Sequence, residues 1–368
     1  MEILKSLCST PTAPFAEYRV ARYVRDFVAR RPRLELTRDR PGNLLIELRG
    51  GKKNLPRWVF TAHMDHPGMV AGPMAGKGVL RASFYGSVLN EYLPGAAVRF
   101  FDGAAEIKGK IRRVSSPDPQ RPIYPATVEI AMESAVAPGA IGMFDQGEGR
   151  IAEGKFYCRC CDDLAGAAAC LAMLDELASR PPASPVAVLL TRAEEQAFIG
   201  CIAACQEGKL LRKSDRVIAI ECSAEQPVAR QGDGVIVRVG DRASVFNSSL
   251  TYFLTETAEA LQKKERGFRH QRALMPGGVC EATVYDLYGY IAASLCVPLR
   301  NYHNMDRQRK RIAAEYIDVG DWRNMVRLFV QLARVGHQYR PGHASLRSKV
   351  ETRYRKYKRL LLKTQAGS

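Results

Sequence analysis

Acidic and imidazole side chains recur in this sequence at positions where they could hold metal ions and move protons. Adjacent carboxylates stand at Asp162-Asp163 and at Glu194-Glu195, and another carboxylate, Glu221, follows them. His63 precedes this group along the chain, and His303 comes after it. Carboxylates and imidazoles bind divalent metal ions, and both can act as general bases. The set therefore suggests a hydrolase with two metal ions, in which Asp162 bridges the pair.

Most of these residues come directly after segments that we expect to be buried strands. Apolar runs end just before His63, Glu194, Glu221 and His303. Strands that alternate with helices favour a mostly parallel sheet, and ligands bind such sheets beyond the carboxyl ends of the strands. We therefore expect the four positions to meet at one edge of a sheet. The strands are predicted at residues 58–62, 185–191, 216–220 and 291–298.

Each motif alone also has a purely structural interpretation. Alternate residues of a strand face the same side, so Asp65 could accept a hydrogen bond from the nitrogen of His63 that does not bind a metal. The same pair could exist without any metal. Asp162-Asp163 precedes a helix of small residues and could cap its N-terminus, and Glu194-Glu195 could also be structural.

The carboxylates become more informative when they are considered together. At one sheet edge they would repel one another strongly unless cations neutralised them. Two divalent ions would do so, and mixed imidazole and carboxylate ligands point first to zinc, with cobalt or manganese as replacements. The four carboxylates are Asp162, Glu194, Glu195 and Glu221.

Length and composition indicate a globular enzyme with more than one domain. The chain of 368 residues is longer than the roughly 250 to 300 residues at which single cores stop growing. Hydrophobic residues at 46% and charged residues at 25% exclude disordered and fibrous classes. No apolar run reaches the roughly 18 residues that span a bilayer, and the start does not read as a signal peptide. We therefore expect a cytoplasmic protein with no membrane partner.

Most of the ten cysteines lie in apolar segments, where a cysteine behaves as a small core residue. The exception is the run Cys158-Arg159-Cys160-Cys161, directly before Asp162. It lacks a second cluster of cysteine or histidine at zinc-finger spacing. Structural packing and a metal or redox role are both open for this run.

The positive charge is concentrated at the end of the chain. The net charge is +17, and residues 347–363 hold eight basic side chains against Glu351 alone, which gives 8 − 1 = +7 and leaves +10 elsewhere. Such a field attracts anionic partners but does not specify a fold. Tyrosines alternate with cations at residues 353–359, as in some nucleic-acid contacts. The tail could therefore be a solvated helix end, a subunit contact or a nucleic-acid site.

An insertion interrupts the alternation of helices and strands. From about residue 70 to 154, short alternating segments are separated by Gly, Pro, Asp and Ser, and helical periodicity is nearly absent. We predict an α/β fold with a mostly parallel central sheet flanked by helices and an inserted small β-barrel-like domain. The predicted parts are residues 1–70 and 155–345 for the catalytic domain, 71–154 for the insertion and 346–368 for the basic tail.

The order of the motifs resembles that of the co-catalytic dinuclear-zinc aminopeptidases of the glutamyl, deblocking and tetrahedral type, clan MH, whose fold is phosphorylase/hydrolase-like. The resemblance covers roughly residues 1–337. The 96 residues between Asp65 and Asp162 match the inserted β domain of this family, whereas related carboxypeptidases and aminoacylases carry their extra domain further along. The matching segments are His63-Met64-Asp65, Asp162-Asp163 with Gly166, Glu194-Glu195, Glu221, residues 277–282 and residues 297–303.

This resemblance implies a role for each position. Glu194 would be the general base, taking a proton from a water shared by the metals and delivering it to the leaving amine. Asp65 would orient His63, and Asp163 would cap or support the helix. One ion would be held by His63, Asp162 and Glu221, and the other by Asp162, Glu195 and His303.

The implied function is an aminopeptidase that acts on peptides and forms homo-oligomers, from dimers to dodecamers. Glu221 stands where these aminopeptidases usually have Asp, as in the carboxypeptidase and deacylase relatives, so a metal-dependent deacylase or carboxypeptidase is the alternative. His66 and Leu164 also replace the more usual Glu and Arg. An alternative of another class is an anion- or nucleic-acid-binding protein that uses the basic tail. The preferred N-terminal residue depends on pocket residues that the sequence does not identify.

Overall fold

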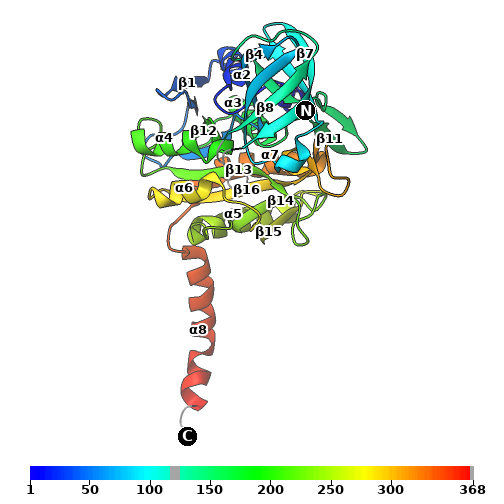
Figure 1. Ribbon diagram of the computed structural model, residues 1–368. Helices are drawn as coiled ribbons and strands as arrows, with labels where there is room; N and C mark the ends of the chain where they lie inside the picture. Colours follow the sequence, from blue (N-terminus) through cyan, green and yellow to red (C-terminus); the bar gives the residue numbers. More distant parts are fainter. Residues whose placement is uncertain (117–124, 365–368) are drawn as a thin grey trace.

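The computed structural model describes residues 1–116 and 125–364, which form a large sheet covered by helices and a separate barrel (Figure 1). The large sheet has 11 strands. Its centre consists of four parallel neighbours, so the predicted α/β fold with a mostly parallel central sheet is confirmed. In spatial order these strands are β12 (Val186–Thr191), β3 (Trp58–His63), β13 (Arg216–Ala224) and β16 (Ile291–Arg300).

Antiparallel strands extend this centre on both sides. Two strands continue beyond β12, three continue beyond β16, and a pair branches from β16. The strands beyond β12 are β2 (Leu44–Leu48) and β1 (Leu34–Arg38). Those beyond β16 are β19 (Glu315–Asp318), β11 (Lys155–Cys158) and β10 (Arg150–Ala152), and the branch is β14 (Val235–Gly240) with β15 (His270–Leu274).

Helices bury both faces of the sheet, as near-continuous apolar strands require. Most of them share one core with one face, and two shorter helices share a second core with the other face. The first group is α1 (Glu2–Cys8), α2 (Tyr18–Ala29), α3 (Leu164–Ser179), α5 (Ser248–Lys264) and α7 (Val319–Val335). The second group is α4 (Ile199–Glu207) and α6 (Glu281–Leu287).

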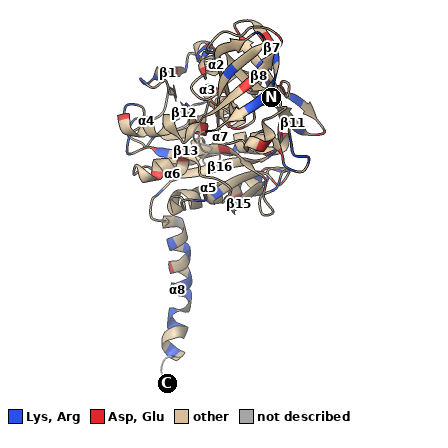
Figure 2. Cartoon of the chain, in the orientation of Figure 1, with Lys and Arg blue, Asp and Glu red and all other residues tan. Residues whose placement is uncertain are grey.

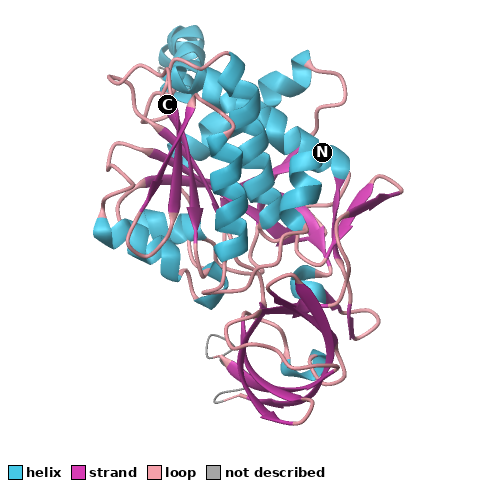
Figure 3. Ribbon diagram, turned by 90° about the horizontal axis from the view of Figure 1, so that it is seen from above, coloured by secondary structure: helices cyan, strands magenta, loops and turns pink. Residues whose placement is uncertain are grey.

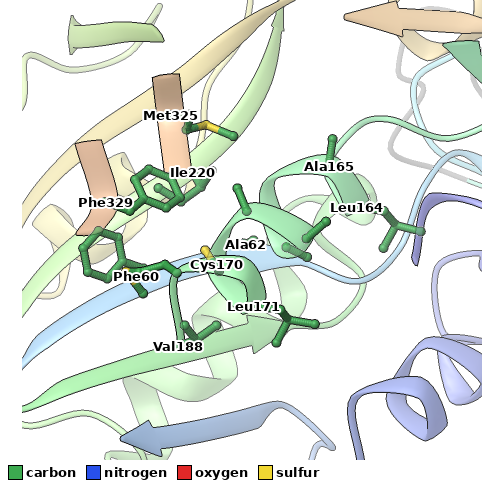
Figure 4. Close-up of a cluster of buried hydrophobic side chains, with 14 of the residues drawn as sticks. Phe60, Ala62, Leu164, Ala165, Cys170, Leu171, Val188, Ile220, Met325 and Phe329 are labelled. Carbon is green, nitrogen blue, oxygen red and sulfur yellow. The ribbon is translucent and has the colours of Figure 1, made fainter. Parts of the chain in front are cut away.

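In strand β3, successive side chains point to opposite faces of the sheet and pack into the core on each face. Phe60 and Ala62 point toward α3 and α7, where the rings of Phe60 and Phe329 lie 5.1 Å apart (Figure 4). Val59 points the other way, into the core with α4 and α6. Helix α3 is rich in Ala and is buried along most of its length, so it can lie close against the sheet. All ten cysteines of the chain are buried, which agrees with their prediction as core residues.

The insertion forms a closed six-stranded barrel, seen end-on in Figure 3, with an apolar core of its own. It lies in the chain between β3 and β10, both of which belong to the large sheet. In order around the barrel, the strands are β4 (Gly68–Gly76), β5 (Val79–Tyr85), β8 (Ala126–Met132), β7 (Ala105–Ser115), β6 (Ala97–Asp102) and β9 (Ile141–Phe144).

The last helix, α8 (Ala344–Thr364), projects away from the body of the molecule (Figure 1). Its side chains are exposed from Leu346 to Thr364. Across residues 1–116 and 125–364, no helix combines the length and the apolar character needed to cross a bilayer.

Candidate metal centre

The structure brings the acidic and imidazole residues together where the parallel strands end. His63 is the last residue of β3 and pairs in register with Thr191, the last residue of β12. Glu221 lies in β13, and His303 follows β16 in a short 3-10 turn. Asp162 comes directly before α3, in the segment that leads from β11. Because neighbouring parallel strands end at the same edge, residues far apart in the chain surround one small volume.

Asp162 lies between the two imidazoles. Its Oδ1 is 3.7 Å from His63 Nε2, and its Oδ2 is 3.6 Å from His303 Nε2. On the far side, His303 Nε2 is 3.1 Å from Glu195 Oε1. Four sets of three side chains have ligand atoms within 4.8 Å of one another in the described part of the chain. Two are the predicted sets, His63, Asp162 and Glu221, and Asp162, Glu195 and His303. The other two are His63, Glu194 and Glu195, and Asp162, Asp163 and Cys222.

Four buried atoms of this cluster have no hydrogen-bond partner within the described part of the chain. They come from both predicted sets, and each is an atom that can bind a metal ion. An unsatisfied buried polar atom is costly, and a cation among these atoms would satisfy all of them at once. The residues present therefore fit divalent metal ions. The atoms are Asp162 Oδ1, Glu195 Oε1, Glu221 Oε1 and His303 Nε2.

The protonation of the cluster reflects the close approach of its charges. Burial opposes the charged imidazolium, yet nearby carboxylates, first Glu194 for His63 and Glu195 for His303, raise the pKa of both histidines well above the usual value. Burial also opposes the charged form of Asp162, but the neighbouring imidazoles of His303 and His63 lower the pKa of that carboxyl.

Two carboxylates in the cluster respond in the opposite way. Burial, followed by repulsion from Asp162, raises the pKa of Glu221 to about 8. Burial raises the pKa of Glu194 well above its usual value, and Glu221 and Glu195 add to the effect. The ionised forms of these two carboxylates require nearby positive charge for their stability, and bound cations would supply it.

Asp65 supports the centre through more contacts than the sequence suggested. The Nδ1 of His63 donates to the backbone oxygen of Asp65 at 3.1 Å, which leaves the Nε2 of His63 facing the cluster. The carboxylate of Asp65 is 3.6 Å from that Nδ1, too far for a hydrogen bond. The carboxylate of Asp65 instead accepts hydrogen bonds from the backbone N–H groups of Glu194 and Glu195, each at 3.0 Å. Asp65 thus connects His63 to the segment that carries the proposed base.

The segment that carries Glu194 and Glu195 has an unusual backbone. Ala193, Ala197 and Phe198 all have positive φ angles, of 47°, 68° and 62°. Non-glycine residues in this region are uncommon and are held there by surrounding structure. Sequence reasoning did not anticipate this turn, because no glycine marks it.

Glu17, just before α2, supplies much of that surrounding structure. Its buried carboxylate accepts the N–H of Ala193 at 2.9 Å and the Nε–H of Arg192 at 2.7 Å. Arg192 in turn donates to the backbone oxygen of Pro41 at 2.7 Å. Glu17 lies 176 positions before Ala193 in the chain, so nothing local could have identified it.

Glu315 is a second buried carboxylate that the sequence did not reveal. One oxygen accepts the backbone N–H groups of Cys161 at 2.7 Å and Asp162 at 3.1 Å, and the other accepts that of His303 at 2.8 Å. A single side chain on β19 therefore fixes the backbone of two proposed ligands. No motif marks Glu315 in the sequence, because its partners are all backbone groups.

His66 and Asp163 complete the surroundings of Asp162. His66 donates to the backbone oxygen of Asp162 at 2.6 Å, and its other nitrogen is 3.0 Å from Asn304 Oδ1. Asp163 occupies the N-cap position of α3, but in the described structure its side chain makes no capping hydrogen bond, so the predicted side-chain cap is wrong. That side chain instead lies against Gly166, where an added Cβ would be 2.2 Å from Asp163 Oδ1. This close approach explains the glycine of the motif.

A pocket of about 540 Å³ adjoins the cluster, and Glu221 belongs to both. Met275, Tyr302 and Arg307 line it, together with Arg238 from β14. Arg238 is only 3% exposed, and its Nη1 donates to Ser223 Oγ at 3.2 Å. Within residues 1–116 and 125–364 its Nε has no hydrogen-bond partner, and the guanidinium makes no ion pair. The wall of the pocket therefore carries a buried cation that makes no ion pair with another described residue, although the nearby carboxylates of Glu221 and Asp241 raise its pKa.

Comparison with known proteins agrees with this arrangement. The model of the M42 glutamyl aminopeptidase family matches residues 42–319. The chain belongs to this family. The resemblance to the glutamyl and tetrahedral aminopeptidases is thereby confirmed, and this M42 chain is a peptide hydrolase of the aminopeptidase type.

Solved structures show how far the M42 fold is shared. The TET1 peptidase of Pyrococcus horikoshii is 22% identical, with a TM-score of 0.72 over 90% of this chain and 98% of its own. An aminopeptidase of the archaeon Desulfurococcus kamchatkensis is 21% identical, with a TM-score of 0.73 over 90% and 94%. A TET aminopeptidase of a marine-sediment Thaumarchaeota archaeon is 18% identical, with a TM-score of 0.74 over 91% and 96%. The comparison with curated proteins gave no match.

Proposed function

We propose that this chain is a two-metal aminopeptidase in which Glu194 is the general base. The observation that carries the proposal is the set of buried atoms without partners, which come from four side chains around one volume. One divalent ion would be held by His63, Asp162 and Glu221, and the other by Asp162, Glu195 and His303. Imidazole and carboxylate ligands favour zinc, with cobalt or manganese as replacements.

The ions, when bound, polarise the carbonyl of the scissile bond and make a water easier to deprotonate. Glu194 then accepts the proton of that water as it attacks, and returns a proton to the nitrogen of the leaving peptide. The carboxylate of Glu194 ends each cycle as it began. Its side chain is about 10% exposed and its Oε2 lies 3.7 Å from His63 Nε2, so it is close to the cluster and still reachable by substrate.

The adjoining pocket supports a preference for peptides whose first residue is acidic. The N-terminal ammonium group would lie at the carboxylates of the cluster, and the first side chain would enter the pocket. Arg238 is buried there and makes no direct ion pair with another described residue, although Glu221 and Asp241 act on it from a longer distance, and a buried charge gains from a direct partner. A carboxylate on the first side chain of the substrate would supply that partner.

Glu194→Gln tests the proposed base. The amide keeps the size of the side chain but accepts no proton, so the variant should retain its metal content and lose about 10²- to 10⁴-fold in turnover. Metal content would be measured by elemental analysis and turnover with a glutamyl peptide. The turn that carries Glu194 should be preserved, because Asp65 and Glu17 hold it through backbone groups. A variant with full activity would contradict the mechanism.

The deacylase or carboxypeptidase alternative has support of its own in Glu221 and Arg238, because Arg238 could also bind the C-terminal carboxylate of a peptide. Paired substrates separate the two functions. An aminopeptidase cleaves a glutamyl peptide with a free amine and a blocked C-terminus, and it fails on the N-acetylated peptide with a free C-terminus. The reverse result would replace the proposal with the alternative.

We also propose that the chain forms a homo-oligomer. The support is the shared fold, since one of the similar structures is described as a dodecamer and another as a tetrahedron or a large octahedral shell. Light scattering on the purified protein would give the mass of the particle. A monomer at micromolar concentration would contradict this part of the proposal.

A further inference from the structure

Helix α8 is attached to the rest of the molecule only at its beginning. His343, just before the helix, contacts Ser248 Oγ at 3.0 Å, and Lys349 pairs with Glu256 of α5 at 2.7 Å. Beyond Lys349, the hydrogen bonds of the described part of α8 are made within the helix itself, such as that from Thr352 to the backbone of Ser348. About two thirds of the helix therefore has no partner outside α8 among residues 1–116 and 125–364, and the helix projects from the body in Figures 1 and 2.

One face of α8 is apolar and exposed. The apolar positions follow each other at intervals of four, four, three and four residues, which places them within about 80° of the helix circumference. Their exposed fractions include 55% for Val350, 54% for Tyr354 and 63% for Leu361. We call this set the α8 stripe, and it consists of Leu346, Val350, Tyr354, Tyr357 and Leu361. An apolar face of this kind is stabilised when it is removed from water.

Basic residues occur along α8 (Figure 2), and some of them border the α8 stripe on both sides. At 100° per residue, Lys349 and Arg353 lie along one edge, and Arg347 and Lys358 lie along the other. Only Glu351 offsets the eight basic residues of this segment. The occupant of the α8 stripe must therefore offer an apolar surface and negative charge side by side.

Two occupants fit this requirement poorly. A second copy of α8 would bring +7 against +7, and the remainder of the chain is also positive, so self-association through this face is opposed by charge. A nucleic acid offers phosphates to the cations, but binding through the cationic side would leave the α8 stripe in water. Neither occupant uses both properties of the helix.

We propose that α8 binds the anionic surface of a lipid bilayer. The helix would lie in the plane of the membrane interface, with the α8 stripe toward the acyl chains and the bordering cations at the phosphates. Tyr354 and Tyr357 suit this position, because tyrosine places its ring and hydroxyl at the boundary between apolar and polar layers. The 21 residues give a helix about 31 Å long, and its eight basic side chains keep it on the bilayer surface rather than across it. The bilayer surface would bind the peptidase through α8 and would not contact the metal centre.

Vesicle sedimentation of the full-length protein tests this proposal. Vesicles of equal parts phosphatidylglycerol and phosphatidylcholine should bind the protein at least about tenfold more tightly than phosphatidylcholine vesicles, and added salt should weaken the binding. The triple variant Val350→Gln, Tyr354→Gln and Leu361→Gln keeps every charge and introduces good helix formers. It should bind the anionic vesicles at least about tenfold more weakly. Peptidase activity equal to that of the unmodified protein would show that it is folded.

A matched variant separates the contribution of the α8 stripe from a general effect of substitution in the helix. The double variant Ser348→Gln and Thr352→Gln changes the side opposite the α8 stripe and should bind anionic vesicles as the unmodified protein does. The proposal is overturned if the full-length protein does not sediment with anionic vesicles, or if the triple variant binds them undiminished. Binding to a short DNA duplex without binding to vesicles would also overturn it and assign the helix to nucleic acid.

Discussion

The metal centre and helix α8 both concentrate charge of one sign, but they hold it in opposite ways. In the centre, the carboxylates of Asp162, Glu195 and Glu221 are buried and leave oxygen atoms without partners. In α8, the cations are exposed and solvated, and pairs such as Arg347 with Glu351 at 2.8 Å are surface contacts. The first arrangement requires a fixed geometry, whereas the second requires only that cations flank an apolar face.

This difference predicts where the sequence can tolerate change. Buried charges are expensive unless they are paired, so several side chains far apart in the chain are committed to the centre, including Asp65, Glu17 and Glu315. Exposed ion pairs contribute about 0 to 1 kcal/mol each, so individual residues of α8 can be exchanged at little cost to folding. Substitutions in the two regions should therefore differ in size and in the property that they change.

Asp162→Asn should produce the largest effect. The residue faces both imidazoles, and the amide weakens its attraction for either cation. We expect the loss of at least one metal ion per chain and a fall of about 10³-fold or more in turnover, since metal ions contribute several kcal/mol to such reactions. Elemental analysis and single-turnover kinetics would measure both. A variant that retains two ions and normal turnover would show that the centre does not depend on this bridge.

Glu315→Gln should have a smaller effect on metal binding. One of its carboxylate oxygens would be replaced by an NH₂ group, which cannot accept the backbone N–H groups that Glu315 now holds. Loss of such a supporting residue typically reduces metal affinity about 10- to 100-fold, which competition with a chelator would measure. Glu106→Gln, on the exposed surface of the barrel, is the matched control and should leave the affinity unchanged. Equal affinities for the two variants would remove Glu315 from the support of the centre.

Arg238→Met should change substrate preference more than it changes turnover in general. A hydrogen bond to a charged group contributes about 1.5 to 3 kcal/mol, so kcat/KM for a glutamyl peptide should fall about 10- to 100-fold. A peptide with N-terminal alanine or leucine should lose much less, because its first side chain makes no ion pair with Arg238 in the unmodified protein. The ratio of the two kcat/KM values is the measurement. Equal losses on both substrates would mean that Arg238 acts on the fold or on Glu221 rather than on the first side chain.

Removal of residues 344–368 should have the smallest effect on the enzyme. Most of α8 lies beyond its contacts with α5, so the free energy of unfolding should change by less than about 1 kcal/mol, and kcat/KM for a short peptide should stay the same. Denaturant unfolding and steady-state kinetics would test both statements. A large fall in kcat/KM would show that α8 takes part in catalysis and that the two regions are not independent.

The sequence predicted those features that local patterns encode. Apolar runs identified β3, β12, β13 and β16, and the residue after each run identified the side chains that meet at the sheet edge. The loss of helical periodicity identified the inserted barrel, because alternation of apolar residues over short segments is specific to strands. These predictions needed no knowledge of long-range contacts, because the carboxyl ends of neighbouring parallel strands lie at the same edge of the sheet.

The supporting residues could not be predicted, because their partners are set by the folded chain. Glu17 and Glu315 bind backbone N–H groups from distant segments, and a backbone group leaves no mark in the sequence. Asp163 was expected to cap α3, but its side chain faces Gly166 and Cys222 instead. Arg238 lies in an apolar strand, and only the pocket next to Glu221 shows why a charge is buried there.

The short hairpin after His303 has a consequence for the variety of substrates that this framework could accept. The backbone oxygen of Asn304 accepts the N–H of Ala313 at 2.8 Å, and its side-chain amide donates to the backbone oxygen of Ala313 at 3.1 Å. Glu315 also holds this segment, because it accepts the backbone N–H of His303. Between these ties, β17 (Met305–Asp306) and β18 (Arg311–Ile312) carry Arg307 to the rim of the pocket. The residues at the tip of the hairpin can therefore change in charge or number while the metal-binding groups stay in place. In this enzyme, substrate preference could therefore change through the hairpin without any change in the residues of the metal centre.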